Sequence, residues 1–397
     1  MSLNTLQIIA EADRCVACGL CLPYCPTYHK TGSEADSPRG RIQLISAVAR
    51  DILPANKRYQ QHINSCLSCR NCETACPNGV SYGGLIDSAR AAIAKPISMS
   101  NRLTNIFIQN PLLMRFAAQS LKLIQQLGLL KIVSVLVPSL KKPIALLPKL
   151  PAQQNWLELY ATRQNKKGDV SLFLGCISNT FDTDTLRASV FVLNRLGYDV
   201  HVPKAQACCG GLARQQGNST LAKDYIEKNN AAFNKANLVI TVASGCGAGL
   251  RDYTDMPIQE ISAFLLQCDW QDVALMPLAN DIAIHEPCTL RNVQKSHTAV
   301  MTLLKKIPSA NVQNLSDNAQ CCGGAGAYML TQADMADALL KDKITAIDKS
   351  KSLLLATSNV GCALHLAAGL RSQNKAVKVV HPVTIIATQL GYTGIIN

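Results

Sequence analysis

The chain has 397 residues, of which 48% are hydrophobic and 16% are charged, so it has enough apolar material for folded cores in more than one domain. This composition excludes a disordered chain, the lack of a three-residue glycine period excludes collagen, and the low charge content excludes a coiled coil. The formal net charge is +13, and residues 91–167 contribute most of it, with 11 basic side chains and one acidic side chain.

Seventeen cysteines are the most unusual feature of the composition. Disulfide bonds mostly stabilise small secreted domains, and the first ten residues lack the basic and apolar pattern of a secretory signal. We therefore expect a reducing, cytoplasmic compartment, in which clustered cysteines are usually metal ligands or redox centres.

Two runs within residues 1–90, the head, share the pattern C-x2-C-x2-C-x3-C-P. This is the pattern of two-cluster ferredoxins, in which the fourth cysteine of each run binds the other cluster. Structural zinc is the alternative, but zinc requires neither three closely spaced cysteines nor the same pattern twice. We expect two 4Fe-4S clusters. The predicted ligands are Cys15, Cys18, Cys21 and Cys76 for the first cluster, and Cys66, Cys69, Cys72 and Cys25 for the second.

From residue 168 onwards the sequence repeats, with offsets of 112 to 116 residues between equivalent cysteines. Each copy contains a single cysteine, then a Cys-Cys-Gly-Gly motif, then a Gly-Cys pair. The eight cysteines are Cys176, Cys208, Cys209 and Cys246 in the first copy and Cys288, Cys321, Cys322 and Cys362 in the second. Their recurrence predicts further metal or redox centres, and buried apolar cysteine is the alternative. Only Cys268 is left over, as an ordinary thiol.

Short β-rich runs precede several of these cysteines, at residues 170–174, 238–243, 282–284 and 353–356, and helix-like segments at 184–196 and 221–233 alternate with them. This alternation predicts βαβ units with a largely parallel sheet. The cysteines would then lie at the carboxyl ends of strands, where open α/β sheets bind ligands. Paired glycines would let the backbone approach an inorganic centre closely.

The predicted fold is therefore mixed, α+β and α/β, with four parts. Residues 1–90 form a largely helical, two-cluster ferredoxin-type domain, in which residues 40–50 have the apolar spacing of a packing helix. Residues 91–167 form a basic, amphipathic helical linker. Residues 168–270 and 271–397 form the first and second modules, which are copies of one α/β unit.

The head, with residues 34–42 (EADSPRGRI) after its first cysteine run, followed by two Cys-Cys-Gly modules, resembles the iron-sulfur subunit of bacterial glycolate oxidase, also called glycolate dehydrogenase. The resemblance covers nearly the whole chain. It implies an electron-transfer subunit that relays electrons from a partner FAD subunit, which oxidises glycolate to glyoxylate, toward quinone or another acceptor. The double module is shared with iron-sulfur subunits of lactate and glycerol-3-phosphate dehydrogenases and with heterodisulfide reductase.

The chain has none of the G-x-G-x-x-G, P-loop or G-x-S-x-G motifs, which fits a subunit without a flavin or catalytic residues of its own. In heterodisulfide reductase each module ends in C-x2-C, whereas here Gly249 and His365 replace the last cysteine. This departure favours a relay over a catalytic disulfide-reducing subunit. His365 could supply an imidazole ligand, with a hydrogen-bonded core histidine as the alternative. Arg14, Arg70 and Arg291 each stand beside a predicted ligand. They are candidates for residues that adjust the reduction potential of the clusters, with solvated surface arginines as the alternative.

Residues 91–149 contain no acidic side chain. Asn110 and Pro111 are typical of a helix start and Gly128 of a helix end. Arg115 and Lys122 share one face of this helix, and the apolar positions are Leu113, Phe116, Ile124 and Leu127. Such a helix can lie on the cytoplasmic face of an anionic membrane, or it can be a linker packed against the body; it is too polar to span a membrane. A scarcity of aromatic residues argues against nucleic acid.

Overall fold

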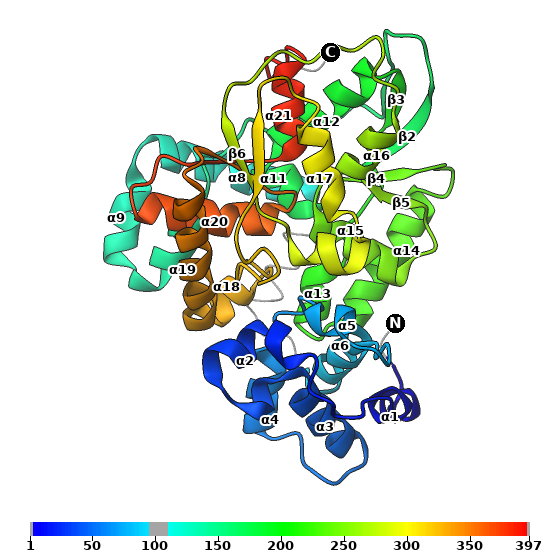
Figure 1. Ribbon diagram of the computed structural model, residues 1–397, viewed down its shortest axis with the longest axis vertical. Helices are drawn as coiled ribbons and strands as arrows, with labels where there is room; N and C mark the ends of the chain where they lie inside the picture. The colour runs from blue at the N-terminus through cyan, green and yellow to red at the C-terminus, as the bar shows by residue number, and fades with distance from the viewer. Residues whose placement is uncertain (1–2, 95–109, 395–397) are drawn as a thin grey trace.

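The computed structural model describes residues 3–94 and 110–394. The helical head lies at one end of the molecule, and the two α/β modules lie side by side above it (Figure 1). The predicted mixed fold, with a ferredoxin-like head and two repeated α/β modules, is confirmed. Of residues 91–167, the stretch 95–109 lies outside the described residues.

The head is built from short helices around a small apolar core that contains Ile42, Ile63 and Leu85. The helix expected over residues 40–50 is present as α3, and the Ser37 hydroxyl caps it by accepting a hydrogen bond from the Gly40 amide at 3.0 Å. The elements are α1 (Thr5–Asp13), η1 (Leu22–Tyr24), α2 (Pro26–Thr31), η2 (Glu34–Asp36), α3 (Pro38–Ala49), α4 (Lys57–Asn64), α5 (Asn71–Thr74) and α6 (Tyr82–Ala92).

The first module has a five-stranded sheet in the order β1-β3-β2-β4-β5, parallel except for β1 at its edge. Edge strand β1 comes from the segment assigned to the linker. The strands of the first module are β1 (Leu159–Tyr160), β2 (Gly168–Phe173), β3 (Tyr198–His201), β4 (Val239–Thr241) and β5 (Ile258–Glu260). Its helices are α11 (Cys176–Phe181), α12 (Thr183–Arg195), α13 (Gly211–Gln215), α14 (Ser219–Ala232), α15 (Ser244–Tyr253) and α16 (Ile261–Gln267).

The second module repeats this topology in a four-stranded, fully parallel sheet with the order β7-β6-β8-β9. The strands are β6 (Asp281–Ile284), β7 (Asn311–Asn314), β8 (Leu354–Ala356) and β9 (Lys378–Val380). The helices are η4 (Leu290–Gln294, a π-helix), α17 (His297–Leu304), α18 (Tyr328–Thr331), α19 (Ala333–Ser350), α20 (Val360–Ser372) and α21 (Pro382–Gln389). The two modules therefore share one plan, as the repeat predicts.

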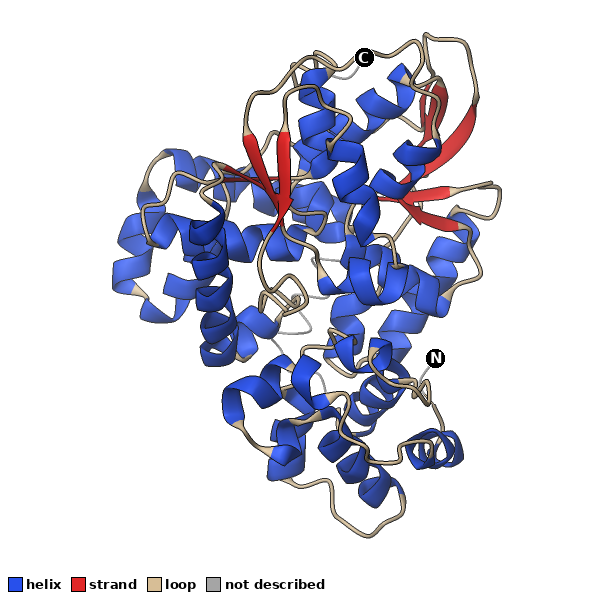
Figure 2. Cartoon of the chain, viewed as in Figure 1, coloured by secondary structure: helices blue, strands red, loops and turns tan. Residues whose placement is uncertain are grey.

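A layer of helices joins the two modules. Helices α12, α16, α17 and α21 pack against one another between the two sheets (Figure 2). One continuous core contains Val190 and Leu193 of α12 together with Val383 and Ile386 of α21. Because α21 belongs to the second module and α12 to the first, the modules share a core instead of meeting at a polar boundary.

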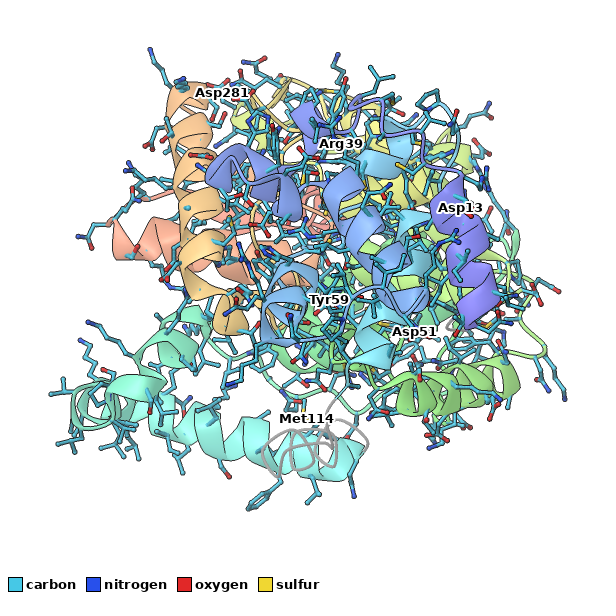
Figure 3. All side chains as sticks on the ribbon, turned by 90° about the horizontal axis from the view of Figure 1, so that it is seen from below. Asp13, Arg39, Asp51, Tyr59, Met114 and Asp281 are labelled. Carbon is cyan, nitrogen blue, oxygen red and sulfur yellow. The ribbon has the colours of Figure 1, made fainter. Side chains whose placement is uncertain are left out.

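The described part of the linker forms a helical hairpin of α8 (Pro111–Gln126) and α9 (Leu129–Leu136), followed by η3 (Pro138–Leu140) and α10 (Lys141–Leu146). The Asn110 side chain caps α8 by accepting a hydrogen bond from the Leu113 amide at 3.2 Å, and Gly128 adopts a left-handed conformation beyond its end, as predicted. In the view from below, Met114 on α8 lies at the opposite edge from Arg39 of the head (Figure 3). Among the described helices, none is long and apolar enough to cross a bilayer.

Candidate metal centres

The two cysteine runs of the head adopt the same unusual backbone conformation. Ala17 and Gly19 in the first run, and Ser68 and Arg70 in the second, all have positive φ angles between 51° and 85°. For residues other than glycine this conformation costs roughly 1 kcal/mol each. The left-handed turns curl each run around its cysteines, so that the thiols of one run face a common space.

Two neighbouring cavities lie inside these loops. Cys15, Cys18, Cys21 and Cys76, the predicted ligands of the first cluster, line one cavity. Cys25, Cys66, Cys69 and Cys72 line the other. Cys72 also borders the first cavity, so the two spaces are adjacent. The structure thus brings together each set of four thiols, and their division between two clusters stays a prediction.

A buried guanidinium lies beside the second set. The Arg41 side chain donates hydrogen bonds to the Asp36 and His62 carbonyls and to the Ser65 hydroxyl, the last at 2.7 Å. Burial opposes its charge, but Tyr82, Cys66 and Cys25 nearby hold its pKa above the ordinary value. A fixed cation here offsets negative charge on a thiolate-bound centre. Arg41 belongs to the EADSPRGRI segment, so part of this segment surrounds the second cavity.

The module cysteines lie where parallel strands end and helices begin. Cys176 is the first residue of α11 after β2, and Cys246 and Cys362 lie in the first turns of α15 and α20, after β4 and β8. Cys288 follows β6. Helix N-termini favour negative charge and lower the pKa of cysteine thiols. The prediction that these cysteines occupy the carboxyl ends of strands is confirmed.

In the first module the four thiols form one group. The Sγ atoms of Cys176 and Cys208 are 3.4 Å apart. Hydrogen bonds from the Cys208 and Cys246 thiols, aided by the charge of Arg214, hold the pKa of Cys209 well below its usual range. A disulfide needs about 2.05 Å between sulfurs, so this contact joins two free thiols. All seventeen cysteines are free.

The second module gathers its four thiols in the same way. The Cys288 thiol donates a hydrogen bond to Cys321, which together with burial raises the pKa of Cys288. Cys322 in turn contacts both Cys321 and Cys362. Four convergent, buried or half-buried thiols suit a thiophilic metal centre, and the donor set fits an iron-sulfur cluster.

Three glycines of the Cys-Cys-Gly-Gly motifs are needed for backbone geometry and packing, and the expected close approach to an inorganic centre stays a prediction. Gly210 and Gly323 have φ angles of +78° and +84°, and a Cβ on Gly323 would lie 2.6 Å from the Ala336 carbonyl of α19. A Cβ on Gly324 would lie 2.9 Å from the Gly361 carbonyl of α20. These glycines therefore let the motif approach neighbouring helices, and this packing brings Cys322 beside Cys362.

Each module also places a cation near its thiols. In the first module the Arg214 guanidinium donates to the Cys209 carbonyl at 3.1 Å and stacks on Tyr253. In the second, Lys343 is 2% exposed and its ammonium donates to the Asp317 carbonyl at 2.5 Å. Burial lowers the pKa of Lys343, and Cys322 and Cys321 oppose that effect. Among the described residues Lys343 forms no ion pair with a carboxylate, although Asp317 lies close enough to favour its charge, and such a buried lysine suits an anionic centre nearby.

The head contacts the second module at a place where cysteines of the head and cysteines of the second module lie close together. Cys69 and Cys321 belong to one buried cluster with Leu67 and Tyr328, against which Cys288 packs. The Asn292 side-chain amide, in the π-helix after Cys288, donates to the Cys69 carbonyl at 2.7 Å, and the Tyr328 hydroxyl donates to the Ser65 carbonyl at 2.8 Å. The second ligand set of the head thus adjoins that of the second module.

Two of the remaining predicted residues have plain structural roles. Cys268 is a core thiol that donates to the Phe264 carbonyl at 3.4 Å, as expected. His365 lies on α20 with its Nε2 atom 3.2 Å from the Ala336 carbonyl, and it is not grouped with the second module's thiols among the described residues.

The candidate tuning arginines are held by other groups. Arg14 donates to the Asn78 carbonyl at 2.8 Å, Arg70 pairs with Glu73 and Asp252, and Arg291 pairs with Glu286. Carboxylates neutralise the charges of Arg70 and Arg291. We therefore regard Lys343, and not Arg291, as the cation that balances charge at the second module's thiols.

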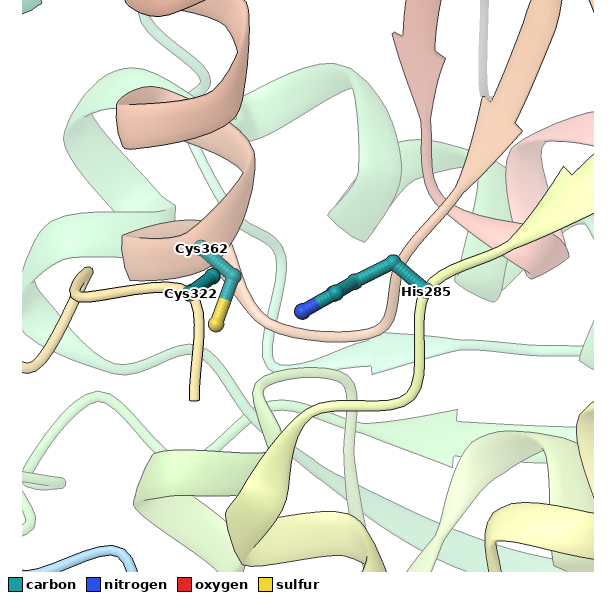
Figure 4. A group of neighbouring side chains, drawn as sticks. All are labelled: His285, Cys322 and Cys362. Atoms are coloured by element: carbon teal, nitrogen blue, oxygen red, sulfur yellow. The ribbon is translucent and has the colours of Figure 1, made fainter. Parts of the chain in front are cut away.

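Sequence reasoning missed one residue of the second module, His285. Its imidazole points toward Cys322 and Cys362 (Figure 4). One ring nitrogen and the two Sγ atoms all lie within 4.8 Å of one another. Burial holds the pKa of His285 well below its usual range, so the imidazole is neutral. The available signal was its place three residues before Cys288, where the first module has Phe173.

Comparison with known proteins agrees with this architecture. Residues 11–80 match the family model of the 4Fe-4S dicluster domain, and residues 170–251 and 282–367 each match that of the cysteine-rich domain. A lactate utilization protein A from Bacillus velezensis is 25% identical over 55% of this chain and 98% of its own length.

Two relatives match almost from end to end. The probable glycolate oxidase iron-sulfur subunit of Bacillus subtilis is 30% identical over 96% of this chain and 95% of its own length. The glycolate oxidase iron-sulfur subunit of Escherichia coli is 31% identical over 91% and 92%, respectively. The chain belongs to the family of glycolate oxidase iron-sulfur subunits.

Proposed function

We propose that this chain is the electron-transfer subunit of a glycolate-oxidising complex. A partner FAD subunit would oxidise glycolate to glyoxylate, and this chain would conduct the electrons toward quinone or another acceptor. The place of Cys69 and Cys321 in one buried cluster carries the proposal, because it brings a predicted ligand of the head close to a predicted ligand of the second module. Iron-sulfur clusters supply one-electron transfer when bound.

The ligand assignment is part of the proposal. In the head, Cys15, Cys18, Cys21 and Cys76 would hold one 4Fe-4S cluster, and Cys66, Cys69, Cys72 and Cys25 the other. In the modules, the two groups of four cysteines would hold further centres. The cavities lined by the head thiols and the cations Arg41, Arg214 and Lys343 support this assignment. The cysteines would bind the clusters, and the three cations would balance the negative charge of the thiolates.

The first module supports acceptor access. A cavity of about 540 Å³ reaches Cys176 and Cys208, and its walls include Trp156 and Lys204. Its size suits a small organic molecule. The head contacts both modules, but only the cysteines of the second module share a buried cluster with a predicted ligand of the head, Cys69, among the described residues. Since the first module has this cavity, we place the second module earlier in the relay and the first nearer the acceptor.

The decisive experiment isolates the complex under anaerobic conditions and identifies its subunits. Glycolate, D-lactate, L-lactate and glycerol 3-phosphate are then added separately while the visible absorbance of the clusters is followed. We expect glycolate to bleach the clusters only when a flavin subunit is present. Bleaching by another substrate in preference to glycolate would overturn the assignment in favour of a lactate or glycerol-3-phosphate dehydrogenase.

The same cavity favours a second candidate, a subunit that reduces a disulfide substrate at the first module. Cys176 is half-buried and lines the cavity, so a small disulfide could reach it. Adding a heterodisulfide to the reduced complex distinguishes the two. Reoxidation together with a changed spectrum of the first-module centre supports disulfide reduction, whereas an unchanged spectrum supports the relay.

The linker hairpin supports peripheral contact with the cytoplasmic face of the inner membrane. Phe116 on α8 and Val135 and Leu136 on α9 are 70%, 77% and 74% exposed, and basic side chains such as Lys122 and Lys131 accompany them. Exposed apolar patches with nearby cations suit an anionic lipid surface. Arg115 donates to the Asn155 side chain, which anchors α8 to the following segment.

Vesicles of phosphatidylglycerol test this contact by co-sedimentation with the complex. Replacing Phe116, Val135 and Leu136 together by Ser should reduce binding at least about tenfold, since each buried apolar side chain contributes about 1.5 kcal/mol or more. Leu6 is 79% exposed on the head, so Leu6→Ser is the matched control. Equal binding of the triple variant and the control would show that the hairpin is a linker or a protein-contact surface instead.

A further inference from the structure

His285 is a buried imidazole with one unused nitrogen. The residue is 1% exposed, and its Nε2 atom has no hydrogen-bond partner in the part of the chain that the structure describes. The ligand atoms of His285, Cys322 and Cys362 lie within 4.8 Å of one another. A buried polar atom without a partner is costly, so its position beside two thiols calls for a third species that it can bind.

The other ring nitrogen fixes the orientation of the imidazole. Nδ1 lies 2.9 Å from the Thr357 hydroxyl, and the His285 backbone amide donates to the Ala356 carbonyl at 2.9 Å. His285 follows β6 and Thr357 follows β8, two strands that pair in parallel. Metal-bound histidines commonly use their second nitrogen in this way, which directs the first toward the metal.

The first module has no counterpart to this imidazole. Phe173 stands three residues before Cys176, as His285 stands before Cys288. Its ring packs on Phe233 with centroids 6.1 Å apart and offers no ligand atom. Gly249, at the position of the missing last cysteine of this module, has no side-chain ligand atom either. The two modules therefore differ in their donors although they share four cysteine positions.

We propose that Nε2 of His285 is a fifth protein ligand of the second-module iron-sulfur centre, together with Cys288, Cys321, Cys322 and Cys362. The first-module centre would have cysteine ligands alone. This inference rests on one part of the proposed function, namely that the second module holds an iron-sulfur centre. A neutral imidazole adds no negative charge, and histidine ligation raises the reduction potential of such centres relative to thiolate.

The test compares the anaerobically isolated complex carrying ¹⁴N-histidine with the same complex carrying ¹⁵N-histidine, by pulsed EPR of the reduced centres. We expect a nitrogen coupling that changes with the isotope and belongs to one centre. His285→Phe, which copies the first module, should abolish it, and His285→Cys should abolish it and lower the potential of that centre. The matched control is His365→Gln, which alters another buried histidine and should leave the coupling intact.

Several results would overturn the inference. They are an isotope-independent spectrum in the unsubstituted complex, a coupling that survives in His285→Phe, or zinc in place of iron in the second module. The isotope comparison needs no substitution, so misfolding of a variant does not affect it. Glycolate-dependent bleaching is scored separately: bleaching without the coupling contradicts only the histidine ligand, and the coupling without bleaching contradicts only the proposed function.

Discussion

Apart from the extra edge strand β1 of the first module, the two modules have the same strand order and the same four cysteine positions, but their surroundings differ. In the second module the cysteines adjoin Cys69 of the head and the buried ammonium of Lys343, and they face an imidazole. In the first module Cys176 and Cys208 border a cavity, and the position of the imidazole is taken by Phe173. The two copies thus share one framework, and the residues around each are the basis of the proposed order of electron transfer.

The largest expected effect concerns the order of the modules. In Cys321→Ser, we expect glycolate-dependent reduction of the first-module centre to slow at least about 100-fold, because the centre next to the head is damaged. In the matched variant Cys208→Ser, the second-module centre should still be reduced at the normal rate. Freeze-quench EPR of the complex measures both. Equal effects of the two variants on both centres would contradict a serial order.

A smaller effect is expected at the contact between the head and the second module. Asn292→Ala removes the hydrogen bond to the Cys69 carbonyl, and the loss of this buried partner should lower the free energy of unfolding by about 1–3 kcal/mol. Denaturant titration, monitored by visible absorbance, measures it. Thr180 stands four residues after Cys176, as Asn292 stands after Cys288, so Thr180→Ala is the control and should cost less. A larger loss in the control would argue against a special role for the docking contact.

A still smaller effect is expected from the cations, on the reduction potentials of the two module centres. Replacing Lys343 by Met removes a buried positive charge near Cys321 and Cys322, which disfavours the added electron and should lower the potential of that centre by about 60 mV, or about 1.4 kcal/mol. Arg214→Met should act in the same direction on the first-module centre alone. EPR-monitored redox titration checks both, and a shift of the wrong centre would contradict the charge assignment.

The smallest expected change is spectroscopic and reverses the difference between the modules. Thr241 stands five residues before Cys246, as Thr357 stands before Cys362, so the first module retains the threonine that orients an imidazole. Phe173→His should therefore give the first-module centre a histidine nitrogen coupling of its own in pulsed EPR. Phe173→Leu serves as the apolar control. If the new histidine gives no coupling, the first module lacks more than the ligand itself.

The sequence predicted the apolar strands of the two sheets better than the polar ones. The apolar runs of β2, β4, β6 and β8 indicate buried strands, whereas β3, which lies between β1 and β2, and the edge strand β7 have the sequences YDVH and NVQN and carry little such signal. Their conformation depends on pairing with distant residues, such as Val312 with Ile282. Neighbouring strands decide the formation of such strands more than local preference does.

The candidate site shows the same limit. The eight head cysteines were recognised because each run is a local loop with regular spacing, and the eight module cysteines because the sequence repeats. The place of His285 three residues before Cys288 was a weak signal; the parallel pairing of β6 and β8, which aligns the ends of strands about 70 residues apart, shows that the imidazole lies beside Cys362. His365 was the better candidate from the missing cysteine, yet the side chain meets the Ala336 carbonyl of α19. The packing of α20 against α19, which the sequence does not reveal, determines that His365 faces this carbonyl and not the thiols.

The shared core of α12 and α21 has a consequence for the synthesis of the protein. The Thr185 and Thr384 hydroxyls meet at 3.3 Å although they are 199 residues apart in the chain. The ribosome must therefore complete the second module before the first can bury Val190 and Leu193 fully. The first module therefore reaches its final packing only after most of the chain has been made.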